Sequence, residues 1–559
     1  MGMKARVIAG IIALLLIIEG LIVVLLFDRS TPSGNAVPTN VGLENAHQKA
    51  NPISLENAHT GTDGWQIPPG KEATIQIQAY ANATSVLPGK KLTFYVSTQQ
   101  EATPYSVEIF RLGWYSGAGG RLMAVQSNLV GHMQGYYDEN TYKLVGCNSC
   151  LIDTKTHLIE ANWRPSYTIT VPSNWTTGVY LAKFIDSNGM QTYVPFDVLG
   201  NPFSTYLAVT PDTTYAAYDD WGGYSLYVGN SPNSNGQEGS NEEQAATQAA
   251  VKVSFDRPYT GGQGASQVLR YEADAIHWME RQGYDLSYIS NVDLHENPDQ
   301  LLQHKAYLSL GHDEYWTKEM RDGVENARNK GISLAFLGAN ASYWQMRFEP
   351  DSKGNPDRTI VCYKVQTRLH DLARDPLYGK DNTRVTAQWR DPVLGRPENA
   401  LIGVMYSGLT HSQQGFPWVV NSHAAASFLD GTGLRPGQQY GCGLVGYEWD
   451  RIYKNGATPA GLQILGTSPT IDENGQADTS DTTYYRASSG VLVFATGSIY
   501  WTSALDSYEY QTDPLCAHQN PEIPGMQKLM LRVMDALVNP QHMQQRLASS
   551  TTSTGIPQL

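Results

Sequence analysis

The sequence contains little cysteine and little charge, and it has no excess of basic residues. Five of the 559 residues are cysteine, which is too few for a small scaffold held together by many disulfides. Charged residues make up 16% of the chain, and 53 acidic residues outnumber 39 basic ones to give a net charge of -14. Proteins that bind nucleic acids need a basic surface to contact the phosphates. We therefore expect no nucleic-acid partner.

Several catalytic and metal-binding motifs are also missing. The chain has no HExxH zinc motif, no Gly-x-Ser-x-Gly at a predicted strand exit and no glycine-rich dinucleotide fingerprint between a strand and a helix. The pair Cys147 and Cys150 in "CNSC" lacks the second pair that a zinc site of this kind needs. This pair is therefore expected either as a local disulfide or as two free thiols.

The N-terminus carries a long apolar run. Lys4 and Arg6 precede residues 7–27, in which Glu19 is the one charged residue. The run is long enough to cross a hydrocarbon core of about 30 Å as a helix. No small-residue cleavage site follows it, which favours an uncleaved signal anchor over a cleaved secretory signal. Positive charge before the span predicts residues 1–6 in the cytoplasm and the rest outside the cell. The chain is then a single-pass protein of the cell membrane, or a secreted protein if the signal is cleaved.

The composition changes twice along the exported part. Residues 28–63 are rich in Ser, Thr, Pro, Asn and Gly, and they predict a flexible stalk. Residues 64–200 hold short runs of β-branched and aromatic residues, such as "KLTFYVST" and "GVYLAKFID". The runs are separated by residues that favour turns. This pattern is typical of an antiparallel β-sandwich.

In residues 201–545 apolar strands alternate with amphipathic helices. Strands are expected at "STYLAVT", "YDLSYIS", "KAYLSL", "ISLAFLG" and "GVLVFATGS", and helices over residues 266–282, 317–330 and 524–539. This alternation predicts an α/β domain with a doubly wound parallel sheet. Residues 350–480 are less periodic and are expected to form long loops and short strands. Residues 546–559 are expected to be a disordered tail.

Two of these strands end at a glycine and bring polar side chains to one edge of the sheet. The strand that ends at Gly311 is followed by "HDEYW", and the strand that ends at Gly338 is followed by "ANASYW". One crossover helix separates the two strands, so we expect them to be neighbours. Ligands of such sheets bind beyond the carboxyl ends of the strands. The two segments should therefore face each other across one cleft, although polar residues also gather at ordinary strand exits.

The side chains of this cleft offer oxygen atoms rather than thiols. His312 can act as a general base, or it can have a structural place beside Asp313 and Glu314. Oxygen atoms of Tyr, Asp, Glu and Asn suit a hard cation. The loop "TTYAAYDDWGGYSLY" after the first strand is expected either to line the cleft or to pack in the interior. Arg257 and Tyr259 of "DRPY" are expected at the same edge, in support of the site.

Several further segments carry a resemblance to a known family. They are "FRLGWYSGAGGRLM", "WTTGVYLAKF", "TTYAAYDDWGGYSLY", "DRPY", "WMERQGYDLSYIS" and "VGYEWDR", beside the stretch from "NVDLHENPDQ" to "ASYWQMRFE". Together they resemble the C-terminal domain of the N,N-dimethylformamidase large (beta) subunit and its relatives, over about residues 65–545.

The resemblance implies an immunoglobulin-like domain followed by a domain like that of class I glutamine amidotransferases, without the cysteine of those enzymes. It also implies a mononuclear iron(III) ion held by two tyrosines and one glutamate, at the matching positions Tyr315, Tyr343 and Glu448. Such an ion polarises an amide carbonyl and activates a water molecule. The residues that would move protons or hold the oxyanion are His312, Asp313, Glu314 and Asn340.

In this interpretation the protein is a membrane-anchored extracellular hydrolase of small amides. Two alternatives stay open. One is a non-catalytic surface protein that binds carbohydrate or another polymer through its many Tyr and Trp side chains. The other is a glycan-acting enzyme that uses carboxylates such as Asp313, Glu314, Glu448 and Asp450. The substrate and the oligomeric state do not follow from the sequence.

Overall fold

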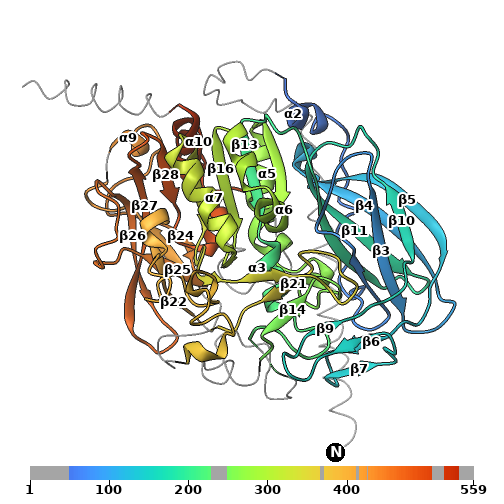
Figure 1. Ribbon diagram of the computed structural model, residues 1–559. Coiled ribbons are helices and arrows are strands. Elements are labelled where there is room, and N and C mark those ends of the chain that lie inside the picture. Colours follow the sequence, from blue (N-terminus) through green and yellow to red (C-terminus); the bar gives the residue numbers. More distant parts are fainter. Residues whose placement is uncertain are drawn as a thin grey trace, which may run out of the picture. The chain divides into compact units, whose positions relative to one another are not determined.

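The computed structural model describes residues 50–227, 229, 249–364, 371–410, 415–424, 426–506 and 522–539. These residues belong to a single unit that begins at Ala50 and combines sheets with helices (Figure 1). The predicted cytoplasmic segment 1–6, the predicted span 7–27 and the predicted tail 546–559 lie outside the described residues. In the part of the chain that is described, no helix is long and apolar enough to span a membrane.

A short helix, α2 (Pro52–Glu56), opens the described chain. Asn51 caps it, and the Asn51 side chain also donates a hydrogen bond to the Gly283 carbonyl oxygen at 2.8 Å. Ile53 is fully buried. The sequence predicts a stalk that reaches residue 63, whereas residues 51–57 are packed here, because Ile53 supplies an apolar anchor and the asparagines bind the α/β domain. Residues 28–49 of the predicted stalk lie outside the described part.

Two sheets that share one core follow over residues 77–198, on the right of Figure 1. The first has the order β1-β3-β10 and the second the order β2-β12-β11-β4-β5, and all pairs except β2-β12 are antiparallel. Their bounds are β1 (Ile77–Ala81), β2 (Ser85–Val86), β3 (Lys91–Thr98), β4 (Pro104–Leu112), β5 (Gly120–Val130), β10 (Tyr167–Thr170), β11 (Gly178–Asp186) and β12 (Gln191–Val198). The alternation of inward and outward side chains therefore predicts the antiparallel arrangement correctly. The immunoglobulin-like topology stays a prediction.

Two small hairpins lie between β5 and β10. They are formed by β6 (Tyr136–Asp138), β7 (Lys143–Val145), β8 (Leu151–Ile152) and β9 (Ile159–Glu160). Cys147 and Cys150 form a disulfide there, which settles the choice between a disulfide and two thiols. The segment packs its aromatic side chains against Trp221 of the α/β domain.

A seven-stranded sheet forms the centre of the α/β domain, in the order β15-β13-β16-β18-β28-β27-β26. The first five strands of this order are parallel, and β27 and β26 are antiparallel to their neighbours. The bounds are β13 (Tyr206–Thr210), β15 (Leu286–Ser290), β16 (Ala306–Gly311), β18 (Ser333–Gly338), β26 (Gln463–Ile471), β27 (Ala477–Arg486) and β28 (Leu492–Ala495). The five predicted strands are thus the parallel ones, and the antiparallel hairpin is an addition within the region where we expect only short strands.

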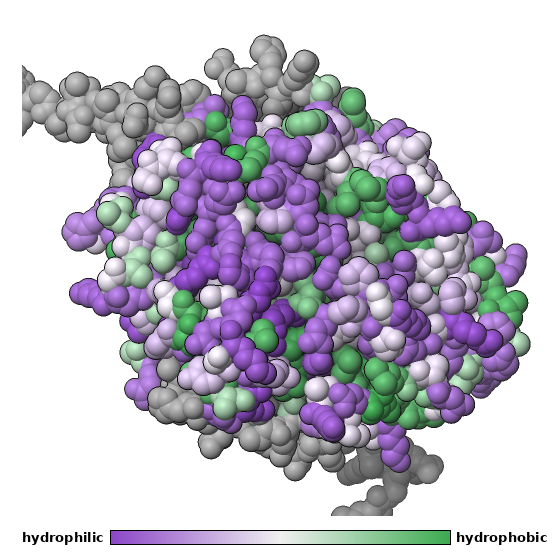
Figure 2. Space-filling view, viewed as in Figure 1, coloured by the Kyte–Doolittle hydropathy of each residue, from purple (hydrophilic) through white to green (hydrophobic). Residues whose placement is uncertain are grey.

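Helices cover both faces of this sheet (Figure 1). One face packs against α5 (Ala273–Arg281), which continues the π-helix η3 (Val268–Glu272), and against α10 (Pro524–Val538). The other packs against α6 (Asn291–Glu296), the 3-10 helix η4 (Pro298–Gln303) and α7 (Lys318–Asn329), which Thr317 caps as predicted. Figure 2 shows hydrophilic side chains around α7 and hydrophobic ones in small groups between them. Two covered faces and parallel strands agree with the predicted α/β architecture, whereas the likeness to glutamine amidotransferases stays a prediction.

The remaining elements lie in the connections. They are η1 (Tyr115–Gly117), α3 (Asp212–Tyr218), β14 (Lys252–Ser254), η2 (Gly261–Gly264), β17 (Tyr315–Trp316), β19 (Trp344–Gln345), β20 (Arg347–Glu349), β21 (Thr359–Val361), η5 (Leu372–Arg374), η6 (Asn382–Arg384), α8 (Asn399–Ile402), β22 (Met405–Leu409), β23 (Phe416–Val419), α9 (Ala426–Leu429), β24 (Gln439–Val445), β25 (Glu448–Arg451) and η7 (Ile499–Ala504).

The strand order fixes where a ligand can bind. In chain order the parallel strands are arranged 2-1-3-4-5, because β15 lies on one side of β13 and β16, β18 and β28 lie on the other. This order is one of the common doubly wound orders, and its switch point is the crevice between the carboxyl ends of the first and third strands. Here these are β13 and β16, so side chains that follow Thr210 and Gly311 converge there.

Candidate functional site

The exits of β16 and β18 lie side by side. The two strands pair in register up to Gly311 and Gly338, and a Cβ atom on Gly338 would lie 1.8 Å from the Gly311 carbonyl oxygen. Only glycine allows this approach. Beyond the glycines, Tyr315 and Trp316 of β17 pair with Trp344 and Gln345 of β19. The prediction that the two polar segments are neighbours is therefore confirmed, whereas the cleft between them stays a prediction.

Two tyrosine hydroxyls converge on the carboxylate of Glu314. The Tyr218 hydroxyl donates to Oε2 at 2.8 Å, and the Tyr227 hydroxyl donates to Oε1 at 2.7 Å. The two rings stack with their centroids 4.2 Å apart. Tyr218 ends α3, which follows β13, and Glu314 follows β16. The three oxygen-bearing side chains thus meet at the switch point of the sheet.

His312 lies between two carboxylates. Its Nε2 atom is 3.4 Å from Oε2 of Glu314 and 3.1 Å from Oε2 of Glu448. The Asn340 side-chain amide donates to the same Glu448 oxygen at 2.9 Å and lies 3.4 Å from the His312 Nε2 atom. Asn340 has φ of 55°, a conformation that asparagine tolerates, and its backbone N–H is held by the Asp450 carboxylate at 2.8 Å. Residues from β16, β18 and β25 therefore build one hydrogen-bonded group.

The site is buried and rich in negative charge. Burial raises the pKa of Glu314; His312 and Lys364 oppose this rise, while the neighbouring Glu448 adds to it. Burial and the Glu314 charge also raise the pKa of both Tyr218 and Tyr227 well above 10. The phenols therefore stay protonated in the protein alone, and ionising them requires a strong positive charge beside their oxygens.

The other predicted residues have different surroundings. Asp313 is fully buried, and its carboxylate accepts hydrogen bonds from the side chains of Asn291, Ser309 and Trp316 at 2.7–2.9 Å. These donors occupy both carboxylate oxygens of Asp313, which therefore links β16, α6 and β17.

The hydroxyls of the two tyrosines predicted as metal ligands bind other side chains. The Tyr315 hydroxyl donates to the Tyr227 hydroxyl at 2.6 Å, so it reaches the carboxylate through that residue. The Tyr343 hydroxyl accepts from the Gln388 amide at 2.7 Å, and its ring lies against Tyr406. Glu448, the third predicted ligand, contacts His312 and Asn340 as described above. The structure thus brings His312, Glu314, Asn340 and Glu448 together, and it places Tyr218 and Tyr227 rather than Tyr315 and Tyr343 on the Glu314 carboxylate.

A hard cation at this position would need phenol oxygens as ligands. Among the described residues, no group of three or more His, Cys, Asp and Glu side chains is arranged to hold a metal ion. Two phenol oxygens and one carboxylate within hydrogen-bonding distance form a set of hard oxygen donors. The sequence does hold a signal for Tyr218 and Tyr227, because their loop follows the first parallel strand and so begins at the switch point.

Comparisons with known proteins place the chain in a family. Residues 106–514 match the model of the family described as N,N-dimethylformamidase beta subunit-like, C-terminal. The N,N-dimethylformamidase beta subunit of Alcaligenes sp is 22% identical over 416 residues, and that of Paracoccus aminophilus is 23% identical over 412 residues. Each alignment covers 64% of this chain and 53% of the relative, so the chain spans about half the length of the curated relatives it matches.

A solved structure of a Paenibacillus sp. cycloisomaltooligosaccharide glucanotransferase matches at 10% identity over 62% of each chain, with a TM-score of 0.15. That score is too low to support any structural likeness. The family match covers most of the chain, including the exits of β13, β16 and β18 and the strand that carries Glu448. The chain belongs to the family of N,N-dimethylformamidase beta subunit-like C-terminal domains.

Proposed function

We propose that this protein is a hydrolase that cleaves the C–N bond of a small amide, at a mononuclear iron(III) site held by Tyr218, Tyr227 and Glu314. The observation that carries the proposal is the convergence of two phenol hydroxyls on one carboxylate at the switch point of the sheet. The family match supports the reaction class, since the matched relatives are named as formamidase subunits.

The donor set fits a trivalent hard cation. Two phenolates and one carboxylate would carry three negative charges, which balance the charge of iron(III). A free tyrosine ionises at a pKa of about 10, so the ion would have to displace both phenol protons on binding. When bound, such an ion supplies Lewis-acid polarisation of the amide carbonyl and lowers the pKa of a water molecule.

His312 and Glu448 are the residues that would move protons. His312 Nε2 lies beside the Glu314 and Glu448 carboxylates, which can stabilise the imidazolium once the ring takes a proton from the attacking water. It can then pass this proton to the amine as the C–N bond breaks. The Asn340 amide holds the Glu448 carboxylate against His312 and so keeps the imidazole oriented.

The predicted N-terminal span would hold this site outside the cell. The proposal of a membrane anchor rests on the apolar run at residues 7–27 and on the basic residues before it. Fractionation of cells that produce the full chain, followed by an alkaline wash of the membranes, tests it: an anchored chain stays in the washed membranes.

The metal site is tested by elemental analysis and a visible spectrum of the purified full chain. We expect about one iron per chain and a purple charge-transfer band from phenolate to iron. Tyr218→Phe and Tyr227→Phe should each weaken iron binding by roughly 10- to 100-fold or more and shift or remove the band.

Tyr343→Phe is the matched variant, since it removes one buried phenol oxygen that belongs to the sequence-predicted ligand set. We expect it to keep both the iron and the band. The reverse pattern would return the ligand set to Tyr315, Tyr343 and Glu448. A folded wild-type chain that binds no iron would end the hydrolase proposal and favour a surface-binding role.

A further inference from the structure

The loop between Tyr218 and Tyr227 contains no regular secondary structure. Residues 219–226 form turns and bends between the two tyrosines. Backbone hydrogen bonds close the ends of the loop and one turn, from the Leu226 N–H to the Ala217 carbonyl oxygen at 3.0 Å and from the Gly223 N–H to the Asp220 carbonyl oxygen at 2.7 Å. Side-chain contacts must fix the rest of its path.

Arg257 binds the backbone of this loop at three places. Its Nη2 atom donates to the Asp219 carbonyl oxygen at 2.6 Å, and Nη1 donates to the carbonyl oxygens of Trp221 and Tyr224 at 3.0 and 2.9 Å. Its Nε atom also lies 2.9 Å from the Asp219 carboxylate. The Arg257 side chain is fully buried. A guanidinium offers five N–H donors in a fixed planar fork, which suits it to hold several carbonyl oxygens at once.

Arg257 is itself held by a separate element. It follows β14, which pairs with β21 and through it with β20. The backbone of Asp256, just before it, accepts a hydrogen bond from the Ala161 N–H of the first domain at 2.8 Å. The guanidinium therefore projects toward the loop from a segment that also has supports outside the loop.

The middle of the loop is fixed from the other side by the first domain. The Trp221 indole N–H donates to the Gln78 side-chain oxygen of β1 at 2.8 Å, and its ring packs edge-on against Trp163 at 5.8 Å between centroids. Trp221 is fully buried. The loop is thus clamped between Arg257 and the hairpin segment of the first domain.

We propose that Arg257 is the positioning residue of the two tyrosines: it sets the path of residues 219–226, so that the Tyr218 and Tyr227 hydroxyls meet at Glu314. This inference rests on the proposed function for its metal part. Loss of the guanidinium leaves three buried carbonyl oxygens and the Asp219 carboxylate without this donor, so the loop moves toward water and the hydroxyls separate.

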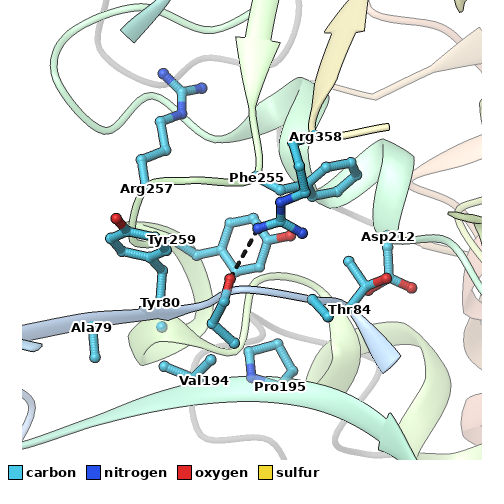
Figure 3. A pocket seen from close by; sticks show the side chains of 13 residues that line it. Ala79, Tyr80, Thr84, Val194, Pro195, Asp212, Phe255, Arg257, Tyr259 and Arg358 are labelled. Carbon is cyan, nitrogen blue, oxygen red and sulfur yellow. Dashed lines mark hydrogen bonds between the residues drawn. The ribbon is translucent and has the colours of Figure 1, made fainter. Parts of the chain in front are cut away.

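Arg358 is the matched control for Arg257, and Figure 3 shows how the two side chains lie. The figure shows a pocket between the two domains, from which Arg257 points away while Arg358 lies over the pocket. Arg358 binds the Ala81 carbonyl oxygen and the Asp256 carboxylate, both at distances of 2.7–2.9 Å. These partners belong to the junction of the domains and not to the tyrosine loop. The pocket has room for about one water molecule, about 20 Å³, so it is too small to be the substrate site.

The test compares Arg257→Lys, Arg257→Met and Arg358→Met in the full chain. Amide hydrogen exchange over residues 213–227 is measured in the metal-free protein, and iron affinity is measured separately. Both Arg257 variants should speed exchange of the loop by about tenfold or more, and Arg358→Met should not. Iron affinity should fall by roughly 10- to 100-fold in Arg257→Lys and should stay unchanged in the control variant Arg358→Met.

The possible results distinguish a failure of the positioning role of Arg257 from a failure of the iron proposal. Wild-type loop exchange in Arg257→Lys, an equal acceleration in Arg358→Met, or faster exchange with unchanged iron affinity would overturn the positioning role. If the wild-type chain binds no iron but the Arg257 variants alone loosen the loop, the iron proposal fails while the placement of the tyrosines by Arg257 stands. Arg257→Lys keeps the test decisive if Arg257→Met does not fold.

Discussion

The buried ion pair between Arg111 and Glu280 should be the strongest single contact between the two domains. Arg111 lies on β4 and Glu280 on α5, and both side chains are 0% exposed. Two parallel hydrogen bonds join them at 2.8 and 2.7 Å. Burial alone would lower the pKa of Arg111, but the Glu280 charge and hydrogen bond, together with Tyr115 and Tyr180, outweigh it and raise the pKa well above its ordinary value. The Arg111 guanidinium therefore stays charged at every pH at which the protein folds.

Arg111→Met removes one partner and leaves the Glu280 carboxylate buried. Breaking a buried pair in this way costs about 3–5 kcal/mol of unfolding free energy. Glu280 keeps two donors, the Asn57 amide at 2.7 Å and the Tyr288 hydroxyl at 3.1 Å, so we expect the lower end, about 3 kcal/mol. The double variant Arg111→Met with Glu280→Gln should regain at least about 1 kcal/mol, because no unpaired charge remains.

Denaturant unfolding followed by tryptophan fluorescence and circular dichroism measures these costs. Arg281→Met is the control, since Arg281 pairs with Glu522 at 2.6 Å but both side chains are about one-third exposed. Such a surface pair is worth less than about 1 kcal/mol. An Arg111→Met chain that unfolds at the same denaturant concentration as Arg281→Met would refute the reasoning, and so would a double variant that is less stable than Arg111→Met.

Two further outcomes concern a buried acid and a strand exit. Burial raises the pKa of Asp212 to about 7, against the opposing hydrogen bond from Thr210. The folded state then keeps a proton that the unfolded chain loses near pH 4, so stability falls as pH rises from about 4 to about 7. Asp212→Asn should remove this loss, and its melting temperature should exceed that of the wild type at pH 8 but not at pH 4; an equal difference at both values contradicts the assignment. Gly338→Ala should cost at least about 2 kcal/mol, because its Cβ would meet the Gly311 carbonyl oxygen at 1.8 Å, whereas Gly261→Ala meets nothing within 4 Å and should be nearly neutral in the same melt.

The sequence predicts the parallel strands and the edge of the sheet at which the site lies. Apolar runs that end at Gly311 and Gly338 are long enough to be read as buried strands, and their exits must share an edge. The positions of these two exits therefore indicate His312, Glu314 and Asn340 as candidate site residues. Glu448 could be named only through the family resemblance, because it follows a region without clear periodicity.

The two tyrosines on Glu314 were harder to identify. As metal ligands the family resemblance names Tyr315 and Tyr343, which lie in the same segments as His312 and Asn340, and it names no residue of the loop that carries Tyr218 and Tyr227. The path of the loop that carries Tyr218 and Tyr227 depends on Arg257 and on contacts with the first domain, and no periodic pattern records such contacts. Asp313 faces inward for a similar reason, because its donors come from elements that are distant in the sequence.

The hydrophobic pattern of the sequence does not predict the β26–β27 hairpin, because the composition of the hairpin is polar. Threonine, serine and aspartate fill "ADTSDTTYYR", yet much of this strand is buried against β28 and β26. Hydroxyl groups satisfied by backbone oxygens make this burial possible, as the Thr482 hydroxyl shows by its bond to the Thr496 carbonyl oxygen at 2.8 Å. A hydrophobic pattern does not register residues of this kind.

The span of the Cys147–Cys150 bond has a practical consequence for producing the protein. Its partners are three positions apart, so the bond closes a very short ring and ties no two secondary-structure elements together. The chain-entropy gain from so small a ring is about 2 kcal/mol, a minor part of what holds a chain of this size. A reducing bacterial host should therefore yield folded material.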